Sequence, residues 1–113
     1  MSQNSNDILI GRAWASHRAG RNGDAIRDFE QAIKADSRNV DAYYGLGLAH
    51  RATEQYPAAE TAFTKALELS QHRLEEIRGN RRENNVESSD DDRYMMLNRM
   101  LAQRLEELKL KSN

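Results

Sequence analysis

A short apolar motif that recurs at a fixed spacing constrains this chain more than any other feature. The motif is an alanine, a phenylalanine and a second alanine, and its two copies lie 34 positions apart: Ala25, Phe29 and Ala32, then Ala59, Phe63 and Ala66. Self-similarity at a period of this size indicates a repeat architecture, in which each repeat is one supersecondary unit. We therefore interpret the chain as two copies of one structural unit.

The motif and its neighbours have the periodicity of a helix. Ala25, Ile26, Phe29, Ala32 and Ile33 occupy positions i, i+1, i+4, i+7 and i+8, which share one helical face. Small alanines let a neighbouring helix approach closely, and the phenylalanine fills the wedge between diverging helices. With 31% charged residues, one proline and few β-branched residues, the composition also favours helices over a sheet. The predicted fold class is all-α.

Turn residues divide the chain into five expected helices. Gly20 and Gly23 supply a first turn, and a polar segment at 36–39 supplies a second. Asp41 or Asn39 can then cap the next helix. The predicted helices span about 7–19, 24–36, 41–53, 57–83 and 90–110. The first four form two helix-turn-helix pairs, and the fourth helix runs well past its repeat.

The second unit resembles a tetratricopeptide repeat. The matching residues are Tyr43, Leu46, Gly47, Tyr56, Ala59, Phe63 and Ala66. The first unit resembles the family mainly in its second helix, because Arg12 replaces the usual Leu, Ser16 the usual Tyr and Ser37 the usual Pro. The resemblance implies an α-solenoid with repeats at 6–39 and 40–73. The remainder of the single predicted domain, 1–113, has no counterpart in the family. Its periodicity and turn residues predict an extension and polar turn at 74–89 and a C-terminal amphipathic helix at 90–110.

The C-terminal helix carries a regular apolar stripe, widened by Met96 and Met100. The stripe advances by three, four, four and three positions through Tyr94, Leu97, Leu101, Leu105 and Leu108. Two repeats leave an apolar face uncovered, since about three stacked repeats are normally needed for stability. The stripe can cap that face within the chain as an antiparallel hairpin, or it can pair between two chains as a homodimer.

The resemblance also implies a concave groove lined by the first helix of each repeat. It places Asp7, Ile10, Trp14, His17, Tyr44, Leu48 and Arg51 on or near this groove. Aromatic and arginine side chains are typical of protein-recognition surfaces. Some family members hold C-terminal carboxylates with a Lys and Asn clamp, but Ile10, Trp14 and Gly45 stand at those positions here. We expect a more apolar peptide or helix as the ligand, unless Trp14 and Tyr44 pack internally or under the C-terminal helix.

No arrangement of residues suggests catalysis, a cofactor or a metal site. The sequence contains no glycine-rich phosphate loop and no nucleophile elbow. His17, His50 and His72 lack metal-ligand spacing, and the run Asp90, Asp91 and Asp92 lacks the alternating ligands of a calcium loop. We therefore expect a protein that is not an enzyme.

Charge and hydropathy argue against nucleic-acid and membrane partners. The formal net charge is -1 and the pI is about 6.3, and the basic residues of the fourth helix alternate with glutamates. No run of eighteen apolar residues occurs, the N-terminal segment does not resemble a signal peptide, and there is no cysteine. The sequence thus predicts a cytoplasmic adaptor that binds a protein or peptide; the alternative is a self-associating structural module.

Overall fold

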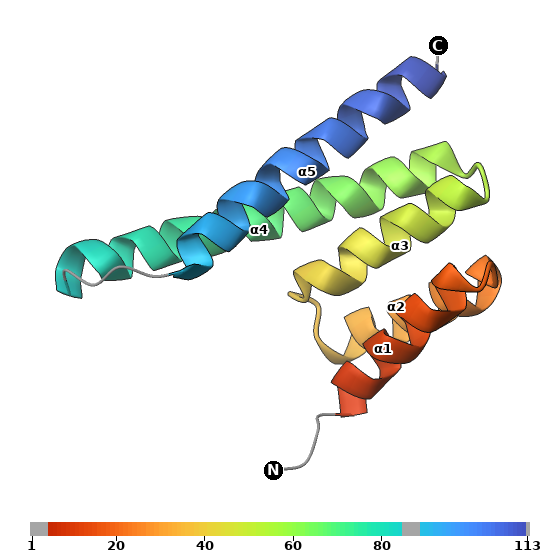
Figure 1. Ribbon diagram of the computed structural model, residues 1–113, viewed down its shortest axis with the longest axis horizontal. Coiled ribbons are helices and arrows are strands. Elements are labelled where there is room, and N and C mark those ends of the chain that lie inside the picture. Colours follow the sequence, from red (N-terminus) through yellow and green to blue (C-terminus); the bar gives the residue numbers. More distant parts are fainter. Residues whose placement is uncertain (1–4, 85–88, 113) are drawn as a thin grey trace.

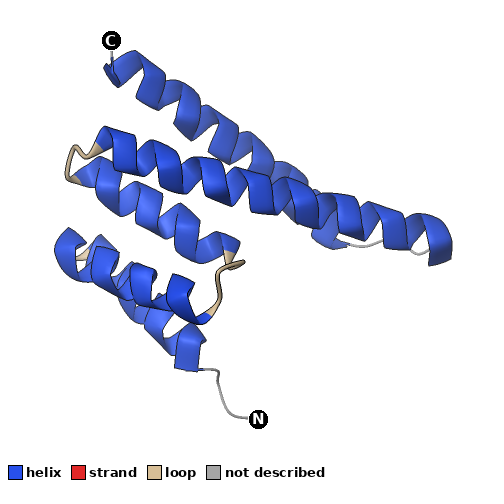
Figure 2. Cartoon of the chain, turned by 180° about the vertical axis from the view of Figure 1, so that it is seen from behind, coloured by secondary structure: helices blue, strands red, loops and turns tan. Residues whose placement is uncertain are grey.

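The computed structural model describes residues 5–84 and 89–112, and within them every element is an α-helix (Figure 1). The helices are α1 (Ser5–Arg18), α2 (Asn22–Ala35), α3 (Val40–Ala52), α4 (Tyr56–Asn84) and α5 (Ser89–Ser112). Each helix packs against the next one along the chain, so the helices form a layered series from α1 to α5 (Figure 2). The predicted all-α fold of five helices, with a long fourth helix and a C-terminal helix, is confirmed.

Local backbone chemistry ends the helices near the predicted turns. Gly20 adopts a φ of +82°, the left-handed conformation that favours glycine at a helix C-terminus, and the Arg21 amide donates to the Ser16 carbonyl oxygen. At the start of α3, the Asn39 side chain accepts a hydrogen bond from the Ala42 amide at 3.0 Å. Asn39 is therefore the cap of α3.

The repeated phenylalanines hold α3 from two sides. All six residues of the repeated motif are fully buried. A Cβ atom on Gly45 would overlap the ring of Phe29 from α2, and a Cβ atom on Gly47 would lie 2.5 Å from the ring of Phe63 from α4. Residues two positions apart lie about 200° apart around a helix. α3 is thus inserted between two aromatic rings, with a glycine facing each ring.

The departure from the family pattern at Arg12 has a structural explanation. Arg12 Nε and Nη2 donate to the two carboxylate oxygens of Asp28 at 2.8 and 2.9 Å, which links α1 to α2. The Asp28 side chain is 5% exposed, whereas that of Arg12 is 64% exposed. The hydrogen bonds from Arg12 lower the pKa of Asp28. A bidentate ion pair at the edge of the core therefore stands where the family has a leucine.

The C-terminal helix packs against α4 within the same chain. α5 lies along α4 and crosses it at an angle (Figures 1 and 2). Leu101 and Leu108 are buried in one apolar cluster with Phe63. Near the start of α5, Arg78 Nε donates to Asp91 Oδ1 at 3.3 Å. The turn residues at 85–88 and the side chains of Ser89 and Asp90, which the sequence assigned to a turn and a cap, lie outside the described part of the chain.

The close approach of α3 to the phenylalanines leads to a stability prediction. Gly47→Ala is expected to destabilise the fold by about 1–3 kcal/mol, because the added methyl group overpacks the contact with Phe63. Gly11 is the matched control, since it is an exposed helical glycine with no neighbouring atom within 4 Å. Gly11→Ala is expected to stabilise by about 0.5–1 kcal/mol. Urea unfolding followed by circular dichroism measures both; equal effects of the two substitutions would contradict this account of the α3 packing.

Candidate peptide-binding cleft

A cleft of about 660 Å³ lies where α3, α4 and α5 meet. Its walls are the N-terminal end of α3, the middle of α4 and the N-terminal half of α5. The apolar lining comprises Val40, Tyr44, Leu69, Tyr94, Met96, Leu97 and Met100. The polar lining comprises Arg38, Asn39, Asp41, His72, Arg73, Glu76 and Arg93. A concave surface with apolar walls and several converging polar groups is the common form of a ligand site.

Each acidic side chain of the cleft has a hydrogen-bond donor or a basic group beside it. Asp41 Oδ2 accepts a hydrogen bond from Trp14 Nε1 at 3.1 Å. Glu76 lies 3.7 Å from His72 Nε2 and 4.0 Å from Arg73 Nη1. By contrast, Arg38 and Arg93 form no ion pair among the described residues, although the Arg93 guanidinium lies 5.7 Å from the centroid of the Tyr94 ring.

A continuous set of aromatic contacts joins the first repeat to the cleft. Trp14 packs edge-on against Phe29, with ring centroids 5.2 Å apart, and lies 6.1 Å from Tyr44. Tyr44 in turn lies 6.0 Å from Phe63. Trp14 and Tyr44 are both half-buried. Trp14 and Tyr44, the two predicted groove aromatics, are therefore neighbours. Each packs against a core phenylalanine and exposes part of its surface to solvent.

The remaining predicted groove residues occupy different environments. Ile10 is only 7% exposed and belongs to the core cluster that contains Phe29, so we leave it out of the candidate surface. Asp7 is exposed, and His17 is half-buried with its Nδ1 atom 2.9 Å from Asn22 Oδ1. Leu48 packs against the cluster that contains the α5 leucines. The surface implied by the resemblance is therefore divided between core, exposed face and α5 contact.

An ion pair links the C-terminal half of α5 to α3. Glu107 Oε1 accepts hydrogen bonds from Arg51 Nη1 at 3.3 Å and from Arg104 Nη1 at 2.7 Å. Hydrogen bonding to Glu107, with a smaller contribution from Tyr44, raises the pKa of Arg104. Arg51, predicted to contact a partner, thus contacts α5 instead in this structure. The interaction holds α5 over α3 at the far end from the cleft.

The α5 stripe residues lie at different depths. Leu101 and Leu108 are buried, whereas Tyr94, Leu97 and Leu105 are half-buried. Met96 is 63% exposed and lines the cleft together with Met100. The sequence contained a signal for this surface, since the two methionines widen the apolar stripe beyond the face that a single packing partner covers.

Two further features were sought in the described residues: a cluster of metal ligands and a helix able to span a membrane. Within 5–84 and 89–112 there is no group of three His, Asp or Glu residues that could hold a metal ion. Over the same residues, no helix combines the length and the apolar character needed to cross a membrane.

Comparison with known proteins identifies the family. The family model described as "Tetratricopeptide repeat" matches residues 10–73, more than half of the chain. The chain belongs to the tetratricopeptide-repeat family. These repeats generally mediate protein–protein interaction, and the family is typically non-catalytic. A comparison with curated proteins gives no significant match.

The family match ends inside α4, before the helix extension and α5. The cleft therefore combines two kinds of wall. Tyr44 and Leu69 come from the matched repeat, whereas Met96, Leu97 and Met100 come from the C-terminal helix outside it. Part of the cleft is thus lined by a helix that lies outside the family match.

The position of α5, and with it the cleft, depends on Leu101. Leu101→Ala is expected to destabilise the fold by about 2–5 kcal/mol, because it removes a fully buried side chain from the cluster around Phe63. Leu110→Ala on the same helix is the control, since Leu110 is 78% exposed and its truncation is expected to change stability by less than about 0.5 kcal/mol. Urea titrations distinguish the two. Similar midpoints for both variants would show that α5 does not pack as described.

Proposed function

We propose that this chain is an interaction adaptor that binds a peptide or protein segment in the cleft between α3, α4 and α5. The observation that carries the proposal is the apolar wall that exposed Met96 and half-buried Met100 form in a cleft also lined by the N-terminal end of α3. Methionine is flexible and polarisable, and it is frequent at surfaces that adapt to partner side chains. The family relationship supports the general role, and the cleft supplies a specific surface for it.

The adjoining aromatic face extends the proposed surface. Asp41 lines the cleft and also accepts the hydrogen bond from Trp14 of the first repeat. A segment seated in the cleft can therefore continue along Tyr44 towards Trp14. Aromatic side chains bury a large area with little loss of side-chain entropy, which suits them to contacts at the centre of an interface.

The alternative, a dimer built on the α5 leucines, has weaker support. Leu101 and Leu108 are already buried by packing against α4 and α3 of the same chain. Pairing between chains through these residues would require α5 to exchange partners.

The absence of cysteine from the sequence suits a reducing compartment, so we propose that the adaptor acts in the cytoplasm.

A peptide selected against the full chain tests the location of the binding site. Short random peptides displayed on phage are panned on the immobilised protein, and the best binder is synthesised for a titration. The double variant Met96→Ala and Met100→Ala is expected to weaken binding by about tenfold or more, because it removes the exposed apolar wall.

Ile8→Ala provides the matched control for this titration. Ile8 is 56% exposed, close to the exposure of Met96, but it lies on α1 and does not line the cleft. Its truncation is expected to leave the affinity unchanged. Full binding by the methionine double variant, with an intact helical signal, would refute the cleft as the site.

A further inference from the structure

We infer that the cleft selects an acidic peptide segment in which one or more apolar side chains are flanked by aspartate or glutamate. This inference rests on the proposed function, since it specifies the chemistry of the ligand that the same cleft receives. It follows from the charges at the rim of the cleft and from the apolar wall between them.

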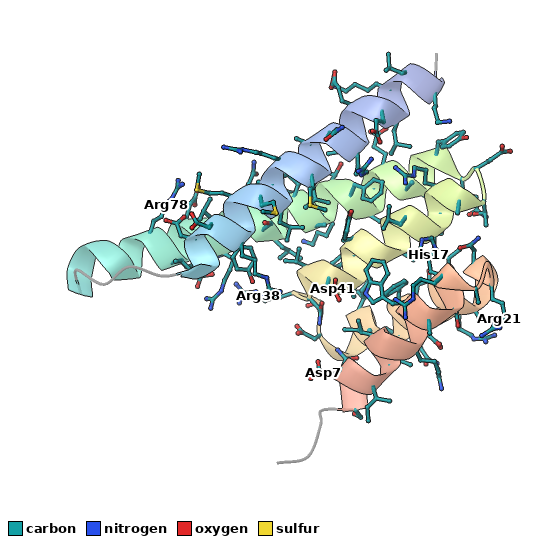
Figure 3. The ribbon with its side chains drawn as sticks, viewed as in Figure 1. Asp7, His17, Arg21, Arg38, Asp41 and Arg78 are labelled. Carbon is teal, nitrogen blue, oxygen red and sulfur yellow. The ribbon has the colours of Figure 1, made fainter. Side chains whose placement is uncertain are left out.

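Two arginines approach the cleft from different walls. Arg38 precedes α3, and Figure 3 shows it beside the N-terminal end of that helix. Arg93 lies in the first turns of α5. Both are exposed, and neither forms an ion pair among the described residues. A guanidinium group presents a planar set of donors that matches a carboxylate. The cleft therefore offers two arginines that are free to pair with ligand carboxylates.

The acidic residues of the cleft, Asp41 and Glu76, are outnumbered by the arginines Arg38, Arg73 and Arg93 in its lining. Asp41 is engaged by the Trp14 indole, and Glu76 is shared by His72 and Arg73. A basic segment would compete with these contacts, and it would also meet repulsion from Arg38, Arg73 and Arg93. An acidic segment meets the carboxylates of Asp41 and Glu76, but the arginines that line the cleft outnumber these carboxylates. Electrostatic complementarity of this kind sets partner specificity more than it sets raw affinity.

The wall between the two arginines requires an apolar group from the ligand. Met96 is 63% exposed, and it lines the cleft beside Val40 and Leu97. A purely acidic, hydrophilic segment would leave this surface in contact with water. Burial of an aliphatic or aromatic side chain there supplies binding energy that charge pairs at an exposed rim do not supply. The expected ligand therefore alternates acidic and apolar residues.

Charge reversal at the rim tests the inference. The probes are the phage-selected peptides themselves, titrated against the full chain and against the double variant Arg38→Glu and Arg93→Glu. The selected sequences are expected to be rich in Asp and Glu next to aliphatic or aromatic residues. Their binding is expected to weaken by about tenfold or more on charge reversal, and to weaken as ionic strength rises.

The control variant is Arg18→Glu with Arg99→Glu, which makes the same change in net charge at exposed arginines outside the cleft. It is expected to bind the selected peptides with unchanged affinity. Equal weakening by both double variants would overturn the inference, because the effect would then come from net charge alone.

Two further outcomes separate the inference from the proposed function. Selected peptides that are basic or uncharged, but that lose affinity with the methionine variant, would refute the acidic specificity and leave the cleft as a peptide site. Peptides whose affinity is unchanged by both the methionine and the arginine substitutions would refute both proposals. Circular dichroism of each variant confirms that the helices are intact.

Discussion

The contact between two phenylalanine rings and two glycines of α3 is the interaction on which the rest of the structure depends. Phe29 and Phe63 approach α3 from α2 and α4 so closely that neither Gly45 nor Gly47 has room for a side chain. This packing fixes the spacing of three successive helices. It also fixes Tyr44, which immediately precedes Gly45 in sequence, contacts Phe63 and lines the cleft.

The extension of α4 determines what surrounds the second repeat. α4 spans 29 residues and continues beyond the segment that matches the family. Its additional length gives α5 a packing partner, and α5 covers the exposed side of the repeat with Leu101 and Leu108. Because α5 crosses α4 at an angle, its N-terminal half borders an open cleft while its C-terminal half is held to α3 through Glu107. Capping of the repeat and formation of the cleft thus have the same cause.

The sequence predicted the features that depend on periodicity. The repeated motif, the five helices and the long α4 follow from spacings along the chain, and so does the α5 stripe. The burial of Ile10 and the pairing of Arg12 with Asp28 were not predictable in this way, because they depend on how α1 packs against α2. Of the cleft residues, Arg38 precedes α3 whereas Arg93 and Met96 lie on α5, and only the packing of α5 brings the two segments together. Periodicity within a helix carries no information about that crossing.

The central claim is that the junction of α3, α4 and α5 receives a peptide, and amide chemical-shift mapping tests it most directly. A phage-selected peptide is titrated into isotopically labelled full-length chain while the backbone resonances are followed. The account predicts that the largest shifts fall at the cleft, around Val40, Tyr44, Leu97 and Met100, with small changes on the exposed face of α2. Shifts concentrated on α1 and α2, with the cleft resonances unmoved, would contradict it.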